Sequence, residues 1–181
     1  MDVERLNADQ GRDAQIVRLF AAAFTASEGE EEGALIGGLA ENLLTGTAPQ
    51  DRVVFTAEEH GAIIGAIIFS RLTYLNDERT VFVLGPVAVA PDRQREGIGQ
   101  RLLAHGLASL RDAGVDIAMT YGDPGYYVKV GFMPISETDA PAPFALKHPE
   151  GWLAQSLTDN PMTPLKGSSR CVEALNDPVF W

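Results

Sequence analysis

The feature that most constrains the fold is a strand followed by a sharp break, a glycine-containing turn and a helix. The apolar run of residues 80–90 predicts a strand, which Pro91-Asp92-Arg93 ends. From Gly97 the spacing of apolar residues predicts a helix that stops near Ala113-Gly114. A strand over residues 115–120 follows, so these elements form one strand-helix-strand crossover.

The segments around this crossover predict a mixed α/β (α+β) fold with a largely antiparallel central sheet flanked by helices. Two amphipathic helices are expected near the start, the first over residues 12–24 with Asn7 and Asp9 as candidate caps, the second after the acidic stretch 28–32. Short strands are expected at residues 3–6, 53–57, 62–69 and 131–134, with a hairpin turn at residues 58–61. A single helical turn is expected at residues 126–130.

The length of the chain predicts one domain over residues 1–181. Regular patterns cover residues 3–135. From Ser136 prolines recur and periodicity fades, apart from a possible strand at Cys171–Leu175. We therefore expect an irregular C-terminal extension, residues 136–181, that packs on the core.

Charge and composition limit the classes of molecule that the protein can be expected to bind. A formal net charge of -11 argues against nucleic-acid binding and is compatible with a cationic substrate such as an amine, although an acidic surface also serves solubility. No apolar run reaches the roughly 20 residues of a membrane span, and the acidic start is unlike a signal peptide, so we expect a cytoplasmic protein. The lone cysteine and the spacing of His60, His105 and His148 predict no metal site.

The turn before the helix that starts near Gly97 is suited to an anion. Backbone N–H groups at a helix start have no intrahelical acceptor, and Gly97 and Gly99 allow close approach. Three cations surround the turn in an otherwise acidic chain, Arg93, Arg95 and Arg101. A dinucleotide fingerprint would need glycine where Leu102 stands, and the Gly-Lys-Ser/Thr of a triphosphate loop is missing. A plain helix start with glycines in its turn remains the alternative.

The strand before this turn contains Gly85-Pro86. Proline cannot donate to a sheet ladder, so the pair indicates a bulge or a parting from the neighbouring strand. A parted strand would leave polar groups free beside Val87 and Val89, where an extended ligand with amides, such as pantetheine, could pair. The alternative is a simple bend near the sheet edge.

These residues resemble a known family. Leu84-Gly85-Pro86-Val87-Ala88-Val89, then Pro91 and Gln94-x-x-Gly97-x-Gly99, look like the coenzyme A motif of the GNAT acyltransferase superfamily. Gly122-Asp123-Pro124-Gly125-Tyr126-Tyr127 with Gly131-Phe132 is similar to a later motif of its YhbS-like branch of predicted N-acetyltransferases. The resemblance covers residues 3–135 and implies the GNAT fold, with a splayed strand pair forming the coenzyme A cleft. The tail matches only through Pro143-Phe144-Ala145-Leu146.

The resemblance implies that acetyl-CoA is the cofactor. Its pantetheine would pair with Val87, Ala88 and Val89, and the Val87 N–H would also act as an oxyanion donor toward the thioester carbonyl. Its pyrophosphate would be held by the loop and the first turn of the helix, at Gln94, Arg95, Glu96, Gly97, Ile98, Gly99, Gln100 and Arg101.

Two residues carry the expected proton transfers. The resemblance implies that Tyr127 protonates the departing thiolate, since a phenol with a pKa of about 10 can donate to a thiolate whose conjugate acid lies near 8.5. A packing aromatic is the alternative. Glu32 is the candidate base for the amine, alongside Glu28, Glu30 and Glu31, and a solvated acidic turn is the alternative for each.

The sequence thus predicts an N-acyltransferase that moves an acetyl group from acetyl-CoA to a primary amine by direct attack. The alternative is a non-catalytic acyl-CoA sensor with the same fold. The expected partner is a small-molecule or peptide amine, with no nucleic acid and no membrane, for a monomer or homodimer. Its pocket is expected from residues 28–32, the turn at residues 72–79 and the tail.

Overall fold

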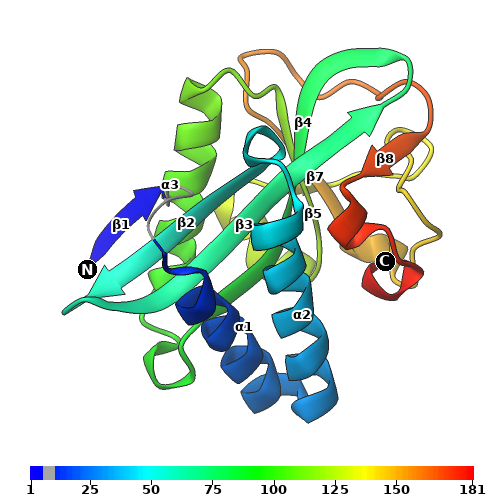
Figure 1. Ribbon diagram of the computed structural model, residues 1–181. Helices are drawn as coiled ribbons and strands as arrows, with labels where there is room; N and C mark the ends of the chain where they lie inside the picture. The colour runs from blue at the N-terminus through cyan, green and yellow to red at the C-terminus, as the bar shows by residue number, and fades with distance from the viewer. Residues whose placement is uncertain (6–10) are drawn as a thin grey trace. The chain divides into compact units, whose positions relative to one another are not determined.

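The computed structural model describes residues 1–5 and 11–181, which form two compact units, Met1–Phe69 with Gly85–Gly106 and Ser70–Leu84 with Leu107–Trp181 (Figure 1). The helices are α1 (Asp13–Glu28), α2 (Glu30–Gly46), α3 (Ile98–Asp112) and α4 (Pro124–Tyr127). The strands are β1 (Asp2–Arg5), β2 (Arg52–Glu59), β3 (Ala62–Tyr74), β4 (Asp77–Val89), β5 (Ile117–Tyr121), β6 (Met133–Pro134), β7 (Trp152–Ser156) and β8 (Ser169–Cys171). None of the helices within these described ranges is long and apolar enough to cross a membrane.

In the first unit the strands lie in the order β1-β2-β3-β4. β1 is antiparallel to β2, from Asp2 opposite Glu58 to Arg5 opposite Phe55. The predicted hairpin between β2 and β3 is confirmed. Its turn is formed by His60 and Gly61, both with positive φ (52° and 80°), as in the mirror-image turns whose twist matches that of the two strands.

Helices α1 and α2 lie side by side on one face of β2 and β3, and α3 lies on the other face (Figure 1). α1 buries the predicted apolar residues, Ile16, Leu19, Phe20 and Ala23. It extends past the predicted end at residue 24, up to Gly29, which turns the chain with a φ of 102°. The candidate caps Asn7 and Asp9 lie outside the described residues. Arg12 occupies the cap position without a side-chain cap bond.

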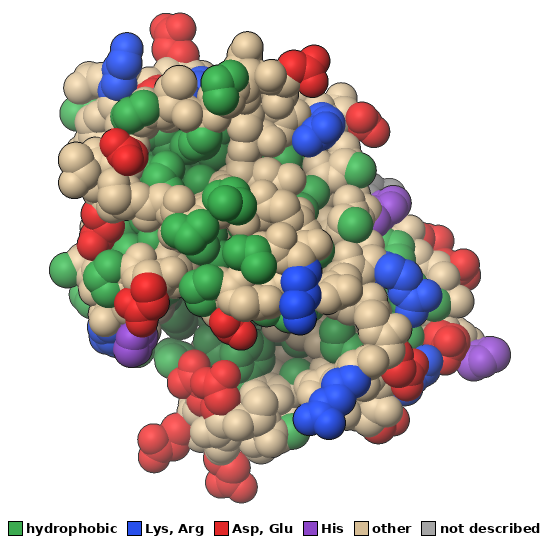
Figure 2. Space-filling model, turned by 180° about the vertical axis from the view of Figure 1, so that it is seen from behind, with side chains coloured by type: hydrophobic (Ala, Val, Ile, Leu, Met, Phe, Trp, Pro, Cys, Tyr) green, Lys and Arg blue, Asp and Glu red, His purple; other side chains and the backbone are tan. Residues whose placement is uncertain are grey.

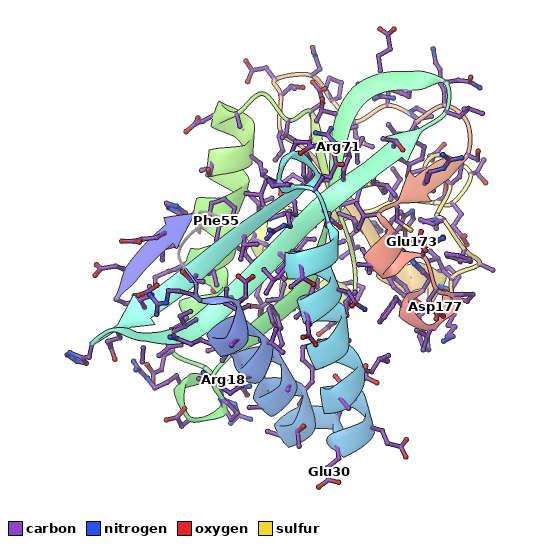
Figure 3. The ribbon with its side chains drawn as sticks, in the orientation of Figure 1. Arg18, Glu30, Phe55, Arg71, Glu173 and Asp177 are labelled. Atoms are coloured by element: carbon purple, nitrogen blue, oxygen red, sulfur yellow. The ribbon has the colours of Figure 1, made fainter. Side chains whose placement is uncertain are left out.

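The other face of this sheet is covered by α3, which comes close because of a glycine. A methyl group at Gly106 would lie 2.9 Å from Ile67 and 3.2 Å from Phe55. Phe55, labelled in Figure 3, also meets Phe69 edge to face with ring centres 6.2 Å apart. The predicted apolar face of α3 is confirmed, with its residues buried at Ile98, Leu102, Leu103, Leu107 and Leu110.

In the second unit the strands lie in the order β8-β3-β4-β5-β7-β6. β4 and β5 are parallel and joined through α3, which confirms the predicted crossover. The pairs of β5 with β7, of β6 with β7 and of β3 with β8 are antiparallel. The fold is therefore the predicted mixed α/β class with a mostly antiparallel sheet.

The expectation of irregular structure after Ser136 is wrong for two segments. β7 lies between β5 and β6, and β8 pairs with β3. The predicted strand at Cys171–Leu175 is wrong beyond Cys171, because Glu173–Leu175 forms a 3-10 turn. The five residues of β7 do not alternate between apolar and polar, since their first three side chains are all buried, so period-two reasoning missed them.

Two tryptophans anchor this part of the chain. Trp152 in β7 is fully buried, and its Nε1–H donates to the carbonyl of Ala140 at 2.8 Å. The Trp181 ring packs edge to face on Trp152 (5.9 Å between ring centres) and stacks on Tyr121 (6.4 Å). Burial of large aromatic area, with the indole hydrogen paired, is what stabilises a segment with little regular structure of its own.

Candidate active site

The pairing of the two parallel strands ends just before Gly85-Pro86. β4 pairs with β5 from Val81 opposite Ile117 to Leu84 opposite Thr120, and β4 then continues to Val89. Gly85 has a φ of 156°, which is open to glycine, and the peptide bond to Pro86 is cis. Thus the last paired residue of β4 is immediately followed by the predicted break.

Beyond this break the polar groups of Val87 and Val89 point away from β3. Ala90 donates its N–H to the carbonyl of Ile64 in β3 at 2.8 Å. Since successive residues of a strand direct their polar groups to opposite sides, Ala88 also faces β3, whereas Val87 and Val89 face away from it. The side-chain amide of Gln94 donates to the Val89 carbonyl at 3.3 Å, which agrees with that direction.

The loop after β4 has the backbone geometry of an anion site. Arg95 and Gly97 both have positive φ, 67° and 77°. The Arg101 N–H donates to the Gly97 carbonyl at 3.1 Å, so the N–H groups of residues 98–100 lie in the turn that precedes it. Positive φ in such a loop curves successive N–H groups toward a common point, where a helix start also favours negative charge.

Side chains of the loop are mostly exposed, at Gln94, Arg95, Glu96, Gln100 and Arg101, whereas Ile98 and Gly99 are buried. The sequence predicted that Arg93 faces the anion, and the structure shows a different arrangement. Its guanidinium forms ion pairs with Glu59 of β2 and with Glu96, the latter at 3.0 Å. These hydrogen bonds, first the one to Glu59 and then those to Glu96, raise the pKa of Arg93. Its charge is therefore taken up within the protein.

Tyr127 lies at the end of α4 in the second unit, among groups that hold its ring and its hydroxyl. The ring meets Tyr126 and Phe132 edge to face, at 5.1 and 5.9 Å between ring centres. The Thr120 side chain of β5 acts on the hydroxyl and partly offsets the effect of burial on its pKa. Thr120 in turn donates to the Leu84 carbonyl at 3.2 Å, at the last paired residue of β4. Burial raises the pKa of Tyr127 to about 12, so the phenol is protonated at neutral pH.

The sequence interpretation did not single out Gly122 as a support of Tyr127. A methyl group at position 122 would lie 2.7 Å from Cε2 of that ring. We expect Gly122→Ala to displace the phenol and to lower kcat about tenfold, with little change in coenzyme A affinity, because small misplacement of a catalytic group is costly. Steady-state kinetics and calorimetric titration check this. Gly125→Ala, where the nearest atom is 3.3 Å away, is the control, and equal losses in both variants would contradict the steric argument.

The candidate bases lie around the start of α2. Glu32 is half-buried, whereas Glu28, Glu30 and Glu31 are exposed. Glu30, labelled in Figure 3, points outward from the start of the helix. Among the four, Glu32 is therefore the one least surrounded by solvent.

The predicted pocket segment at residues 72–79 meets the tail within the second unit. Residues 75–79 and tail residues between Ser156 and Lys166 line a groove of about 1340 Å³ at the N-terminal ends of β4 and β5. Arg79 joins its walls, donating to Asp77 (2.7 Å) and to the carbonyl of Pro164 (2.7 Å). The Arg79 hydrogen bonds lower the pKa of Asp77. Tyr127 and Thr120 lie at the opposite ends of these strands.

The histidines contribute no cluster. His105 is exposed on α3 against Phe55, His60 occupies the hairpin turn, and His148 lies 3.5 Å from Glu150. Within residues 1–5 and 11–181, no group of three His, Cys, Asp or Glu residues is arranged to hold a metal ion.

Comparison with known proteins identifies the family. Residues 14–132 match the Acetyltransferase (GNAT) family. The uncharacterized N-acetyltransferase YjhQ of Escherichia coli is 34% identical over 140 residues, 75% of this chain and 77% of that protein. A GNAT family acetyltransferase from Brucella melitensis, solved with acetyl-CoA, superposes with a TM-score of 0.73 at 28% identity, covering 96% of this chain and 98% of that one. Escherichia coli YhbS, solved with CoA, gives a TM-score of 0.76 at 21% identity, covering 98% and 92%, and shows the shared fold.

The chain belongs to the GNAT acetyltransferase family, since the matched segment covers more than half of its length. Within that family, its similarity to YjhQ and YhbS places it in the YhbS-like branch of N-acetyltransferases.

Proposed function

We propose that the protein is an acetyl-CoA-dependent N-acetyltransferase that acetylates a primary amine by direct attack. The observation that carries this proposal is the curved loop with positive φ at Arg95 and Gly97, set before α3 in a member of the GNAT family. The Brucella melitensis and Escherichia coli relatives were solved with acetyl-CoA and CoA.

The residues present fit such a cofactor. The N–H groups of residues 95–100 would hold the pyrophosphate, with the exposed Arg101 beside them. Val87 and Val89, whose polar groups face away from β3, would pair with the amides of pantetheine. Acetyl-CoA supplies the activated acetyl group when it is bound. The chain binds it, orients it and handles the protons.

Three groups of the chain would act on the reacting atoms, one by a hydrogen bond and two by proton transfer. The Val87 N–H would donate to the thioester carbonyl oxygen, on which negative charge grows as the amine attacks. The Tyr127 phenol, protonated at neutral pH, would donate its hydrogen to the departing sulfur. Glu32 would accept a proton from the amine, directly or through water. Both products then leave without a covalent enzyme intermediate, and solvent would return a proton to Tyr127 and take one from Glu32.

The acceptor is proposed to be a cationic small-molecule or peptide amine. The chain carries a formal net charge of -11. On the face shown in Figure 2, acidic side chains of the described residues are spread across the surface, with Lys and Arg dispersed among them. Such a field attracts cations and raises their local concentration.

The test of this function combines two measurements on the full chain. Calorimetric titration should show CoA binding, and a thiol-release assay over amines, polyamines and peptide N-termini should show turnover that depends on the acceptor. CoA binding without turnover on any acceptor would favour the sensor. No CoA binding at all would overturn the proposal.

A glycine substitution tests the loop by itself. Gly97→Val places a β-branched residue at a φ of 77°, which strains the loop, so we expect the Kd for CoA to rise at least about tenfold. Gly114→Val is the matched control, since Gly114 has a φ of 81°, also has no atom within 4 Å of an added methyl group, and follows the other end of α3. An equal loss of CoA affinity in the control would contradict a local role for the loop.

A further inference from the structure

The loop that would bind pyrophosphate carries an acidic side chain of its own. Glu96 lies between Arg95 and Gly97, the two residues whose positive φ curves the backbone. A free carboxylate there would repel the phosphates that the N–H groups attract. Two like charges a few ångströms apart near a protein surface repel each other, and this repulsion opposes the attraction of the N–H groups.

Arg93 holds that carboxylate. Its Nε and Nη2 both donate to Oε2 of Glu96, at 3.2 and 3.0 Å. Its Nη1 donates to Oε2 of Glu59. Glu59 is the last residue of β2, next to the His60–Gly61 turn, so it offers a fixed anchor within the same unit.

The three side chains therefore form a bridge that runs from β2 to the loop. Arg93 and Glu59 are partly covered, with 27% and 31% of their side chains exposed, so their ion pair is less screened than a fully exposed pair. Glu96 is more open, with 48% of its side chain exposed. The single guanidinium of Arg93 is paired with two carboxylates, so none of its positive charge is left for a further anion. It does not take the position of a phosphate ligand.

We propose that Arg93 is a positioning residue for the cofactor. Anchored on Glu59, it draws the Glu96 carboxylate aside and offsets part of its charge, so that the loop N–H groups present an anion site with a weaker opposing charge. The inference rests on the proposed function, because the anion is the pyrophosphate of CoA.

A double-mutant cycle tests this role with two probes, CoA and pantetheine, which lacks the phosphates. We expect Arg93→Ala to raise the Kd for CoA about tenfold, the effect of about 1.4 kcal/mol of uncompensated charge, and to leave the Kd for pantetheine within about twofold. Adding Glu96→Gln to Arg93→Ala should restore CoA affinity to within about threefold of the wild type, because the charge that needed Arg93 is then gone.

The affinities of these variants for CoA and pantetheine distinguish the possible roles of Arg93. Loss of CoA affinity that persists in the double variant would overturn the inference, since Arg93 would then bind phosphate or shape the loop itself. An Arg93→Ala variant that binds CoA normally would also overturn it. Weakened pantetheine binding would indicate a general structural defect and count against it. A wild-type chain that binds no CoA would overturn the proposed function as well.

Arg111→Ala is the matched control for net charge. Arg111 is exposed in the last turn of α3. It follows Ile98 by 13 residues, which corresponds to about 20 Å along the helix axis. That exceeds the screening length of about 8 Å at physiological salt, so the Kd for CoA should change by less than about twofold.

Discussion

Replacing Tyr127 with phenylalanine should lower kcat at least about tenfold, and by as much as about 10⁴-fold if the phenol is the only proton donor to the departing thiolate. The Kd for acetyl-CoA should stay near the wild-type value. Phenylalanine keeps the ring contacts with Tyr126 and Phe132, and only the hydroxyl group is lost. Single-turnover kinetics with saturating acetyl-CoA measure the chemical step directly.

The pH dependence follows from the raised pKa. Burial raises the pKa of Tyr127 to about 12, so its protonated form is kept up to that pH and lost only above it. Between about pH 7 and pH 10, the kcat of the wild type should therefore not decrease through ionisation of Tyr127. The pH profiles of kcat for the wild type and for Tyr127→Phe should have the same shape over this range. Tyr126→Phe is the control for the neighbouring ring and should retain turnover within about twofold. Normal turnover of Tyr127→Phe would remove this residue from the mechanism.

The largest effect on stability is expected at Trp152. Trp152→Ala should lower the free energy of unfolding by about 3–5 kcal/mol, because the indole is fully buried and its removal leaves a cavity. The change also leaves the Ala140 carbonyl without its donor and removes the packing partner of Trp181. Urea denaturation followed by circular dichroism gives the difference.

Trp152→Phe separates the two contributions. The phenyl ring keeps part of the buried area and loses the hydrogen bond to Ala140, so a smaller loss of about 1–3 kcal/mol is expected. A loss below about 1 kcal/mol in Trp152→Ala would show that the segment around β7 adds little to stability, against the packing described above.

The candidate cofactor loop could be predicted because its signals are local. Glycine at position 97, the proline that ends the strand, and the apolar spacing of α3 all act within a few residues of one another. The role of Arg93 could not be predicted in the same way. Glu96 is three residues away and visible in the sequence, but Glu59 lies 34 residues away and reaches Arg93 only through the hairpin between β2 and β3.

The surroundings of Tyr127 show the same limit. Its spacing before Gly131 suggested a proton donor, but nothing in the sequence showed that Thr120 would influence its hydroxyl or that Gly122 would leave room for its ring. Both contacts depend on how α4 folds back on the end of β5. The raised pKa of Tyr127 is likewise a product of burial, which the sequence does not state.

By itself the sequence determined the order of elements through residue 134, the apolar faces of α1 and α3, and the loop that begins with Gln94, because hydrogen bonds and side-chain contacts over three or four residues decide such features. The tertiary structure alone decided that β7 lies between β5 and β6, that Trp181 stacks on Tyr121, and that Arg93 bridges Glu59 and Glu96. Apart from the local pair of Arg93 with Glu96, these pairings join residues far apart in the chain, and their free energy comes from packing and charge contacts that exist only once the chain has folded.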